Sequence, residues 1–126
     1  MQKSGEDYLE AILVQEIKHD SPCVRSTDIA RHLGVSKPSV SRAMSNLKAA
    51  GYIEMESYGE VRLSVKGRAV AEEVYERHRM LTRFLRDILG VDPAIAEHDA
   101  CLIEHDISSE SMKCLTDFIR RQCPNE

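Results

Sequence analysis

The feature that most constrains this chain is a pair of short amphipathic helices separated by a tight turn. Ser26 or Thr27 can cap the first helix, and Gly34 can end it. Ser36 can cap the second helix, and Gly51 follows its end. Two helices joined by a turn of this length predict a helix-turn-helix. The positions expected to face inward are apolar: Ile29, Ala30, Leu33, Val40, Ala43, Met44, Leu47 and Ala50.

The outward face of the second helix carries hydrogen-bond donors suited to phosphates and base edges, and no acidic residue. A helix filled only for solubility would usually carry some glutamate. Polarity then alternates over residues 52–64 around a Tyr58-Gly59 turn, which predicts a two-stranded hairpin, or wing. The candidate DNA-binding residues are Lys37, Pro38, Ser39, Ser41, Arg42 and Asn46, with Arg62 of the wing able to reach a backbone phosphate.

Charge divides the chain at the same place. The net charge is −4, but between Arg25 and Arg68 eight basic residues stand against four acids, and elsewhere nine stand against seventeen. A basic segment in an acidic protein is typical of a nucleic-acid-binding module joined to an acidic regulatory part. Charge alone does not exclude the alternative of an ordinary solvated surface of mixed charge.

Composition and length predict an ordinary globular protein without a membrane span. The 126 residues suffice for one domain or two small subdomains, and no apolar run approaches the roughly 20 residues that a span needs. No signal-peptide pattern opens the chain, so we expect a cytoplasmic protein. The cysteines are too widely spaced for a CxxC zinc site, and we expect them to stay reduced: Cys23, Cys101, Cys114 and Cys123.

The remaining elements predict a mainly α fold. Ser4 can cap a first helix with Leu9, Ile12, Leu13 and Ile17 inward, and residues 23–25 can form a short strand. A long helix is predicted from a Ser64 cap to about Leu89, and Asp92-Pro93 opens the next helix. A last helix is predicted to begin near Ser108 or Ser109.

Cys101, Glu104 and His105 are spaced to place a thiol, a carboxylate and an imidazole on one face of a helix. Taken alone, this triplet is better explained by a buried cysteine beside a solvated Glu-His pair. Nitrogen, oxygen and sulfur donors together nevertheless suit a borderline transition ion. Asp7, Glu10 and His78 add enough donors for two ions, although each can also be an ordinary surface or capping residue.

Several motifs in order resemble the DtxR/MntR family of metal-dependent bacterial transcriptional repressors. The family pattern is carried by Glu6-Asp7-Tyr8-Leu9-Glu10, Thr27-Asp28-Ile29-Ala30, Ser36-Lys37-Pro38-Ser39-Val40, Val65-Lys66-Gly67, His78 and Cys101-x-x-Glu104-His105. The resemblance implies a winged-helix DNA-binding domain over residues 1–65 and an all-α metal-binding and dimerisation domain over residues 66–126. It also implies the short form of the family, without an SH3-like third domain.

The resemblance further implies a homodimer that binds double-stranded operator DNA when it holds Mn²⁺ or Fe²⁺, with two ions per chain possible. Its ligands would be Asp7, Glu10, His78, Cys101, Glu104 and His105. Asp7 matches the manganese-sensing branch and Cys101 the iron-sensing branch, so the chain is a hybrid. Thr82 and Glu97 depart from the iron branch and put its second, ancillary site in doubt, although the adjacent His98 could substitute.

We expect metal to act as a clamp that fixes the distance between the two recognition helices of a dimer. One alternative keeps the winged helix but replaces metal with a small organic ligand or with oxidation of Cys101. A small metallohydrolase is a second alternative, but no substrate cleft or phosphate-cradling loop is evident, so we expect no enzyme. A purely helical interaction module would leave the basic face from Lys37 to Lys48 unexplained.

Overall fold

Helices make up most of the chain, as the sequence predicts. The computed structural model describes residues 3–56 and 59–122, and it divides into the units Met1–Glu73 and Val74–Glu126. The first unit holds α1 (Lys3–His19), β1 (Val24–Arg25), α2 (Ser26–Leu33), α3 (Lys37–Ala49), β2 (Ile53–Met55), β3 (Glu60–Leu63) and the start of α4 (Val65–Arg83). The second holds the rest of α4, the π-helical turn η2 (Phe84–Ile88), α5 (Pro93–Ile103) and α6 (Ser109–Gln122).

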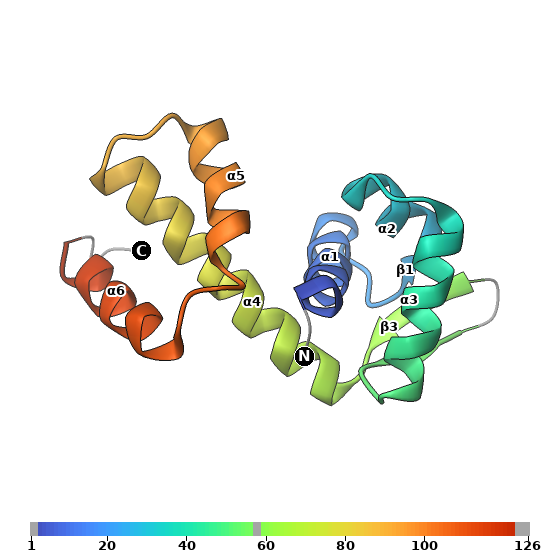
Figure 1. Ribbon diagram of the computed structural model, residues 1–126. Helices are drawn as coiled ribbons and strands as arrows, with labels where there is room; N and C mark the ends of the chain where they lie inside the picture. Colours follow the sequence, from blue (N-terminus) through green and yellow to red (C-terminus); the bar gives the residue numbers. More distant parts are fainter. Residues whose placement is uncertain (1–2, 57–58, 123–126) are drawn as a thin grey trace. The chain divides into compact units, whose positions relative to one another are not determined.

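The predicted helix-turn-helix is confirmed as α2 and α3 (Figure 1). Gly34 ends α2 at φ +67°, a conformation that favours glycine, and its N–H donates to the carbonyl of Ala30. The Ser36 hydroxyl accepts from the backbone N–H of Ser39 at 3.2 Å, which caps α3 as expected. Buried apolar residues hold the two helices together: Ile29, Ala30, Val40, Met44 and Leu47.

Two predicted helix starts differ from the structure by one or two residues. Arg25, not Ser26 or Thr27, occupies the N-cap of α2, because the hydroxyl of Ser26 instead donates to the carbonyl of Gly59 at 3.0 Å. Ser4 lies inside α1, which is already helical at Lys3. The predicted inward face of α1 is confirmed for Leu9, Ile12 and Leu13, but Ile17 in its last turn is 55% exposed.

The wing is a three-stranded antiparallel sheet of order β1-β3-β2, rather than an isolated hairpin. Val61 in the central strand pairs with Val24 on one side and Met55 on the other. Ile53, Val61 and Leu63 are buried, as the alternation predicts, whereas Met55 is 36% exposed. The predicted turn residue Tyr58 lies outside the described residues, and Gly59 after it has φ +75°.

The end of α3 is bonded to the start of α4. Ser64 donates its hydroxyl to the carbonyl of Gly51 at 2.7 Å, and Lys66 donates to the carbonyl of Ala50 at 3.1 Å. The same Ser64 hydroxyl accepts from the N–H of Gly67, which confirms the predicted cap. Gly67 is also pressed against Tyr52, because a Cβ added to this glycine would lie 1.9 Å from the Tyr52 carbonyl oxygen. These contacts attach α4 to the end of α3.

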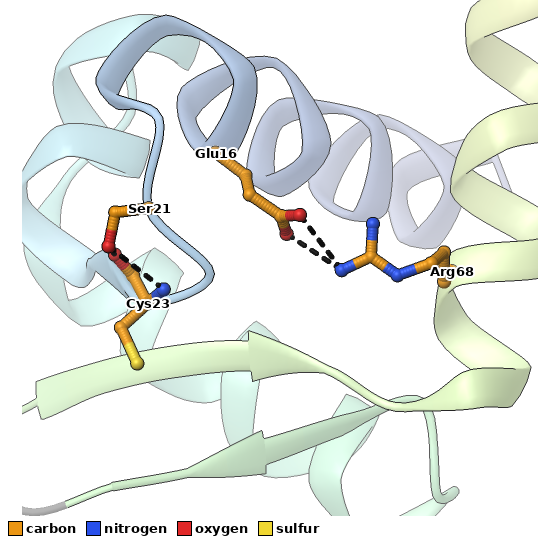
Figure 2. A network of polar contacts seen from close by, with 4 residues as sticks. All are labelled: Glu16, Ser21, Cys23 and Arg68. Carbon is orange, nitrogen blue, oxygen red and sulfur yellow. Dashed lines mark hydrogen bonds and ion pairs between the residues drawn. The ribbon is translucent and has the colours of Figure 1, made fainter.

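An ion pair links α1 to α4 within the first unit. Figure 2 shows Glu16 of α1 facing Arg68 of α4, with the Arg68 Nη2 atom 2.9 and 3.0 Å from the two carboxylate oxygens. The neighbouring Ser21 hydroxyl bonds the backbone of Cys23 and shapes the bend before β1. Arg68 is 37% exposed, so the pair contributes modestly to the free energy of folding.

In the second unit, α5 and α6 pack with the C-terminal half of α4 (Figure 1). Phe84 and Phe118 meet edge to face, with ring centroids 6.4 Å apart. Asp92 caps α5 by accepting from the N–H of Ala94, and Ser108 caps α6 by accepting from the N–H of Ser111, as the sequence predicts. The buried centre of this unit is Met80, Leu81, Ala100, Met112 and Ile119.

Two further expectations concern the long helix and the cysteines. The α-helix predicted to reach about Leu89 ends at Arg83 and continues as the π-helical turn η2, before Gly90 turns the chain at φ +76°. Cys23, Cys101 and Cys114 are free thiols, as expected, and Cys123 lies outside the described residues. Among the described residues, no helix has the length and apolar character of a membrane span.

Gly67→Ala should lower the free energy of unfolding by about 2 kcal/mol or more, despite the better helix propensity of alanine. The added Cβ would overlap backbone atoms of Tyr52, which cannot move without separating α3 from α4. Urea denaturation followed by circular dichroism measures the change. Gly34→Ala is the comparison, because it adds only backbone strain in open space. A loss at Gly67 no larger than that at Gly34 would contradict this account.

Candidate metal centre and DNA-binding face

A fully buried carboxylate lies at the end of α5. Glu104 has 0% exposure, and its Oε1 atom has no hydrogen-bond partner among the described residues. The sequence predicts Glu104 and His105 within a helix, but α5 ends at Ile103, and Glu104 is its C-cap. Burying a carboxylate is costly unless a cation or several donors compensate its charge. Glu104 therefore marks a position where positive charge is required.

His78 supplies part of that charge. Its Nδ1 atom lies 3.1 Å from Glu104 Oε2 and 3.8 Å from the sulfur of Cys101. The hydrogen bonds with Cys101 and then Glu104 raise the pKa of His78 to about 10, although burial opposes the shift. With this pKa, the imidazole is protonated at neutral pH. The simpler interpretation of His78 as an isolated surface residue is wrong.

Cys101 and His105 complete the group within the second unit. The alternative interpretation, a buried cysteine beside a solvated Glu-His pair, is wrong. Cys101 is exposed, and Glu104 is buried. His105 lies just past the end of α5, with its Nε2 atom 3.3 Å from Glu104 Oε1. That approach does not meet hydrogen-bond geometry, so the oxygen remains unsatisfied despite the short distance. The contact still adds an imidazole to the group.

These residues fit a transition-metal ion. His78, Cys101 and Glu104 offer one ligand atom each, and the three atoms lie within 4.8 Å of one another. An ion with ligand bonds of about 2.0–2.3 Å holds neighbouring donors about 3–4 Å apart, as His78 is from its two partners. The mixture of nitrogen, sulfur and oxygen excludes a typical magnesium or calcium shell. A bound cation would also compensate the buried carboxylate.

The other predicted ligands lie elsewhere in the sequence and on other elements. Asp7 and Glu10 are half-buried residues of α1 in the first unit, so their membership in the centre stays a prediction. Thr82 donates its hydroxyl to the carbonyl of His78 at 2.8 Å, inside α4. Glu97 and His98 are exposed on α5, and within the described part of the chain neither joins a group of three potential ligands.

The predicted DNA-binding face is exposed on α3. Lys37, Pro38, Ser41, Arg42 and Asn46 are all exposed, and no acid occurs between Lys37 and Ala49. Ser39 is half-buried, and its hydroxyl accepts from that of Ser36 at 2.8 Å. Its backbone N–H donates to the same Ser36 hydroxyl, so Ser39 is bonded to the N-cap of α3 and is less available to DNA than the sequence predicts. The rest of the face presents cations and hydrogen-bond donors to solvent.

Arg62 of the wing has an acidic partner. Its guanidinium forms an ion pair with Glu56, and the side chains are 43% and 44% exposed. Sequence reasoning missed this pair because it depends on how the hairpin aligns its two strands. The placement of Glu54 and Glu56 two residues apart, alternating with Ile53 and Met55, was the available signal.

Two family models together cover nearly the whole chain. The iron dependent repressor N-terminal DNA binding domain matches residues 1–61. The iron dependent repressor metal binding and dimerisation domain matches residues 64–125, which include His78, Cys101, Glu104 and His105.

Comparisons of the chain with individual proteins agree with these family models. An uncharacterized HTH-type transcriptional regulator of Methanocaldococcus jannaschii is 31% identical over 121 residues, which are 96% of each chain. The transcriptional regulator MntR of Escherichia coli O6:H1 is 36% identical over 118 residues, covering 92% of this chain and 73% of MntR. The solved structure of the manganese regulator SloR superimposes with a TM-score of 0.79 at 26% identity, covering 95% of this chain but only 55% of SloR, so the chain spans about half of that protein. The chain belongs to the iron dependent repressor family, the DtxR/MntR family of metal-dependent transcriptional regulators.

Proposed function

We propose that this protein is a metal-dependent transcriptional repressor that binds operator DNA as a homodimer and controls genes of metal-ion homeostasis. The observation that carries the proposal is the buried Glu104 carboxylate, gathered with His78 and Cys101 in one metal-sized group. The basic, acid-free face of α3 supplies a surface for DNA. The domain descriptions of the family support both halves of the proposal.

We propose Mn²⁺ as the activating ion, with Fe²⁺ second. Carboxylate and imidazole ligands suit manganese, whereas the Cys101 thiolate favours softer ions. The likeness to MntR and to the manganese regulator SloR supports manganese. Asp7, Glu10 and His105 would supply the further ligands of a second ion, since carboxylates can bridge two metals.

Metal would act as a clamp. Asp7 and Glu10 stand three residues apart on α1, one turn of the helix that packs against α2 and α3. Ions held jointly by these acids and by the group around Glu104 would fix the spacing of two recognition helices, which a symmetric operator requires. Without metal, the acidic groups would repel one another. Shifting the dimer from mostly inactive to mostly active would require about 5 kcal/mol of differential metal binding.

The domain limits, location and rival functions follow from the same proposal. Residues 1–65 would form the DNA-binding domain and residues 66–126 the metal-binding and dimerisation domain, which is supported by family matches that end at 61 and begin at 64. Operator binding requires access to the chromosome and therefore a cytoplasmic location.

Membership in a family of transcriptional regulators supports the absence of catalysis. The metal-binding description disfavours an organic effector or cysteine oxidation as the trigger.

The dimer surface would lie on α5 and the end of η2. Ile95 and Leu102 are 55% and 50% exposed and seven residues apart, which places them on one face of α5. Leu89, which follows η2, is 58% exposed. Apolar side chains exposed in this number within a small unit are typical of an interface, and a second copy of the chain is the partner that the family description supports.

Glu104→Gln should lower Mn²⁺ affinity about tenfold or more and abolish Mn²⁺-stimulated DNA binding. The substitution keeps the side-chain volume but removes the buried charge, and losses of that size follow even when supporting groups around a metal are removed. Calorimetry measures metal affinity, and fluorescence anisotropy measures binding to a duplex selected by the protein from randomised DNA. Glu97→Gln, on the exposed side of α5, is the matched control. Wild-type binding that is equal in Mn²⁺ and in chelator would refute metal dependence.

Arg42→Ala should weaken binding to the selected duplex by about 1–3 kcal/mol while leaving Mn²⁺ affinity unchanged. Arg42 is exposed on the acid-free face of α3, and α3 belongs to a different unit from the group around Glu104. Arg120→Ala on α6 removes the same charge away from the helix-turn-helix and should leave DNA affinity close to that of the wild type. Equal losses in the two variants would show that α3 has been misassigned as the recognition helix.

Ile95→Glu should raise the dissociation constant of the dimer at least about tenfold, because each of two symmetry-related copies would bury a charge. Analytical ultracentrifugation over a concentration series measures the effect. Ala94→Glu adds the same charge at the neighbouring exposed position of α5 and is the control. If both variants remain dimers as tight as the wild type, the interface lies elsewhere.

A further inference from the structure

The register of the wing gathers its charged residues on one side. Ile53, Val61 and Leu63 are buried, and the alternating residues of β2 and β3 point to the opposite side of the sheet. Arg62 stands directly across from Glu54 in the antiparallel ladder. The outward side of β2 and β3, with Glu56 that follows β2, carries Arg62 and three acids, Glu54, Glu56 and Glu60, and Arg25 of β1 stands across from Glu60.

Glu56 is the acid that holds the arginine. Its Oε1 atom accepts a hydrogen bond from Arg62 Nη2. The backbone N–H of Glu56 also donates to the carbonyl of Glu60 at 2.8 Å. This backbone hydrogen bond between the two sides of the hairpin positions Glu56. An arginine fork binds a carboxylate or a phosphate with the same donors, and it cannot fully satisfy both. In the free protein, a carboxylate occupies Arg62.

The recognition helix differs from the wing in this respect. α3 carries Lys37, Arg42 and Lys48 with no acid, whereas the one arginine of the hairpin lies among carboxylates. An incoming phosphate would be attracted to α3 directly. At the wing it would meet three carboxylates against two arginines, Arg25 and Arg62, and the guanidinium of Arg62 would already be bonded to Glu56.

We propose that Glu56 lowers the DNA affinity of the wing by occupying Arg62, so that a backbone phosphate must displace Glu56 to gain the contact. This inference rests on the proposed function as a DNA-binding protein. Glu56 acts through Arg62 and does not itself contact DNA. When DNA binds to the wing, a backbone phosphate would replace the Glu56 carboxylate as the partner of Arg62. Because the ion pair is about half exposed, the exchange is readily reversible and its effect is moderate.

Glu56→Gln should therefore raise affinity for the selected duplex about three- to fivefold, the upper range for an exposed ion pair. Anisotropy titrations of the full-length protein in Mn²⁺ measure the gain. Glu54→Gln is the matched control, because it removes the same charge from the same strand and side but leaves the pair intact; its gain should stay below about twofold. Thermal denaturation should show that Glu56→Gln is no more stable than the wild type, so the gain does not come from a firmer fold.

A double-mutant cycle separates release of Arg62 from general charge repulsion. In an Arg62→Gln background, Glu56→Gln should add less than about twofold, because no arginine remains to release. Equal gains from Glu54→Gln and Glu56→Gln, or a Glu56→Gln gain that persists without Arg62, would overturn the inference while leaving the proposed function intact. Failure of the wild-type protein to bind any selected duplex would instead refute the proposed function itself.

Discussion

The buried carboxylate of Glu104 places the strongest electrostatic constraint on the second unit. The side chain is fully buried, and removing the partner of a buried charge lowers the free energy of unfolding by about 3–5 kcal/mol. His78 compensates one oxygen, and the geometry of His105 leaves the other without a hydrogen bond. A network that is only partly satisfied is a poor way to stabilise a fold. The arrangement is better explained as a receptor for a cation, to which His78, Cys101 and Glu104 would each supply one ligand atom.

Local rules account for most of the fold that the sequence predicts. Caps and stops such as Gly34, Ser36 and Asp92-Pro93 act within a few residues, so their geometry follows from composition alone. Spacing also brings Cys101 and Glu104 into one group. Spacing does not reveal which of them is buried, because burial depends on the packing of α4, α5 and α6 around both.

The contacts that the sequence did not predict join residues far apart in the chain or depend on strand register. Glu16 and Arg68 are 52 positions apart, and each is an unremarkable surface charge until α1 and α4 pack. The pairing of Glu56 with Arg62 requires the alignment of β2 with β3. The acids in the segment with an excess of basic residues are unevenly placed: α3 carries none, whereas three carboxylates of the wing share the side of the sheet that carries Arg62.

Helix α4 is the element that the two units share. Its first turns are fixed to the end of α3 by Ser64, Lys66 and the close approach of Gly67 to Tyr52. Arg68 attaches the same turns to α1, and His78 lies ten residues further along the same uninterrupted helix. Helix α4 therefore belongs to both units: its first turns are bonded to α3 in the first unit, and its C-terminal half carries His78 in the second.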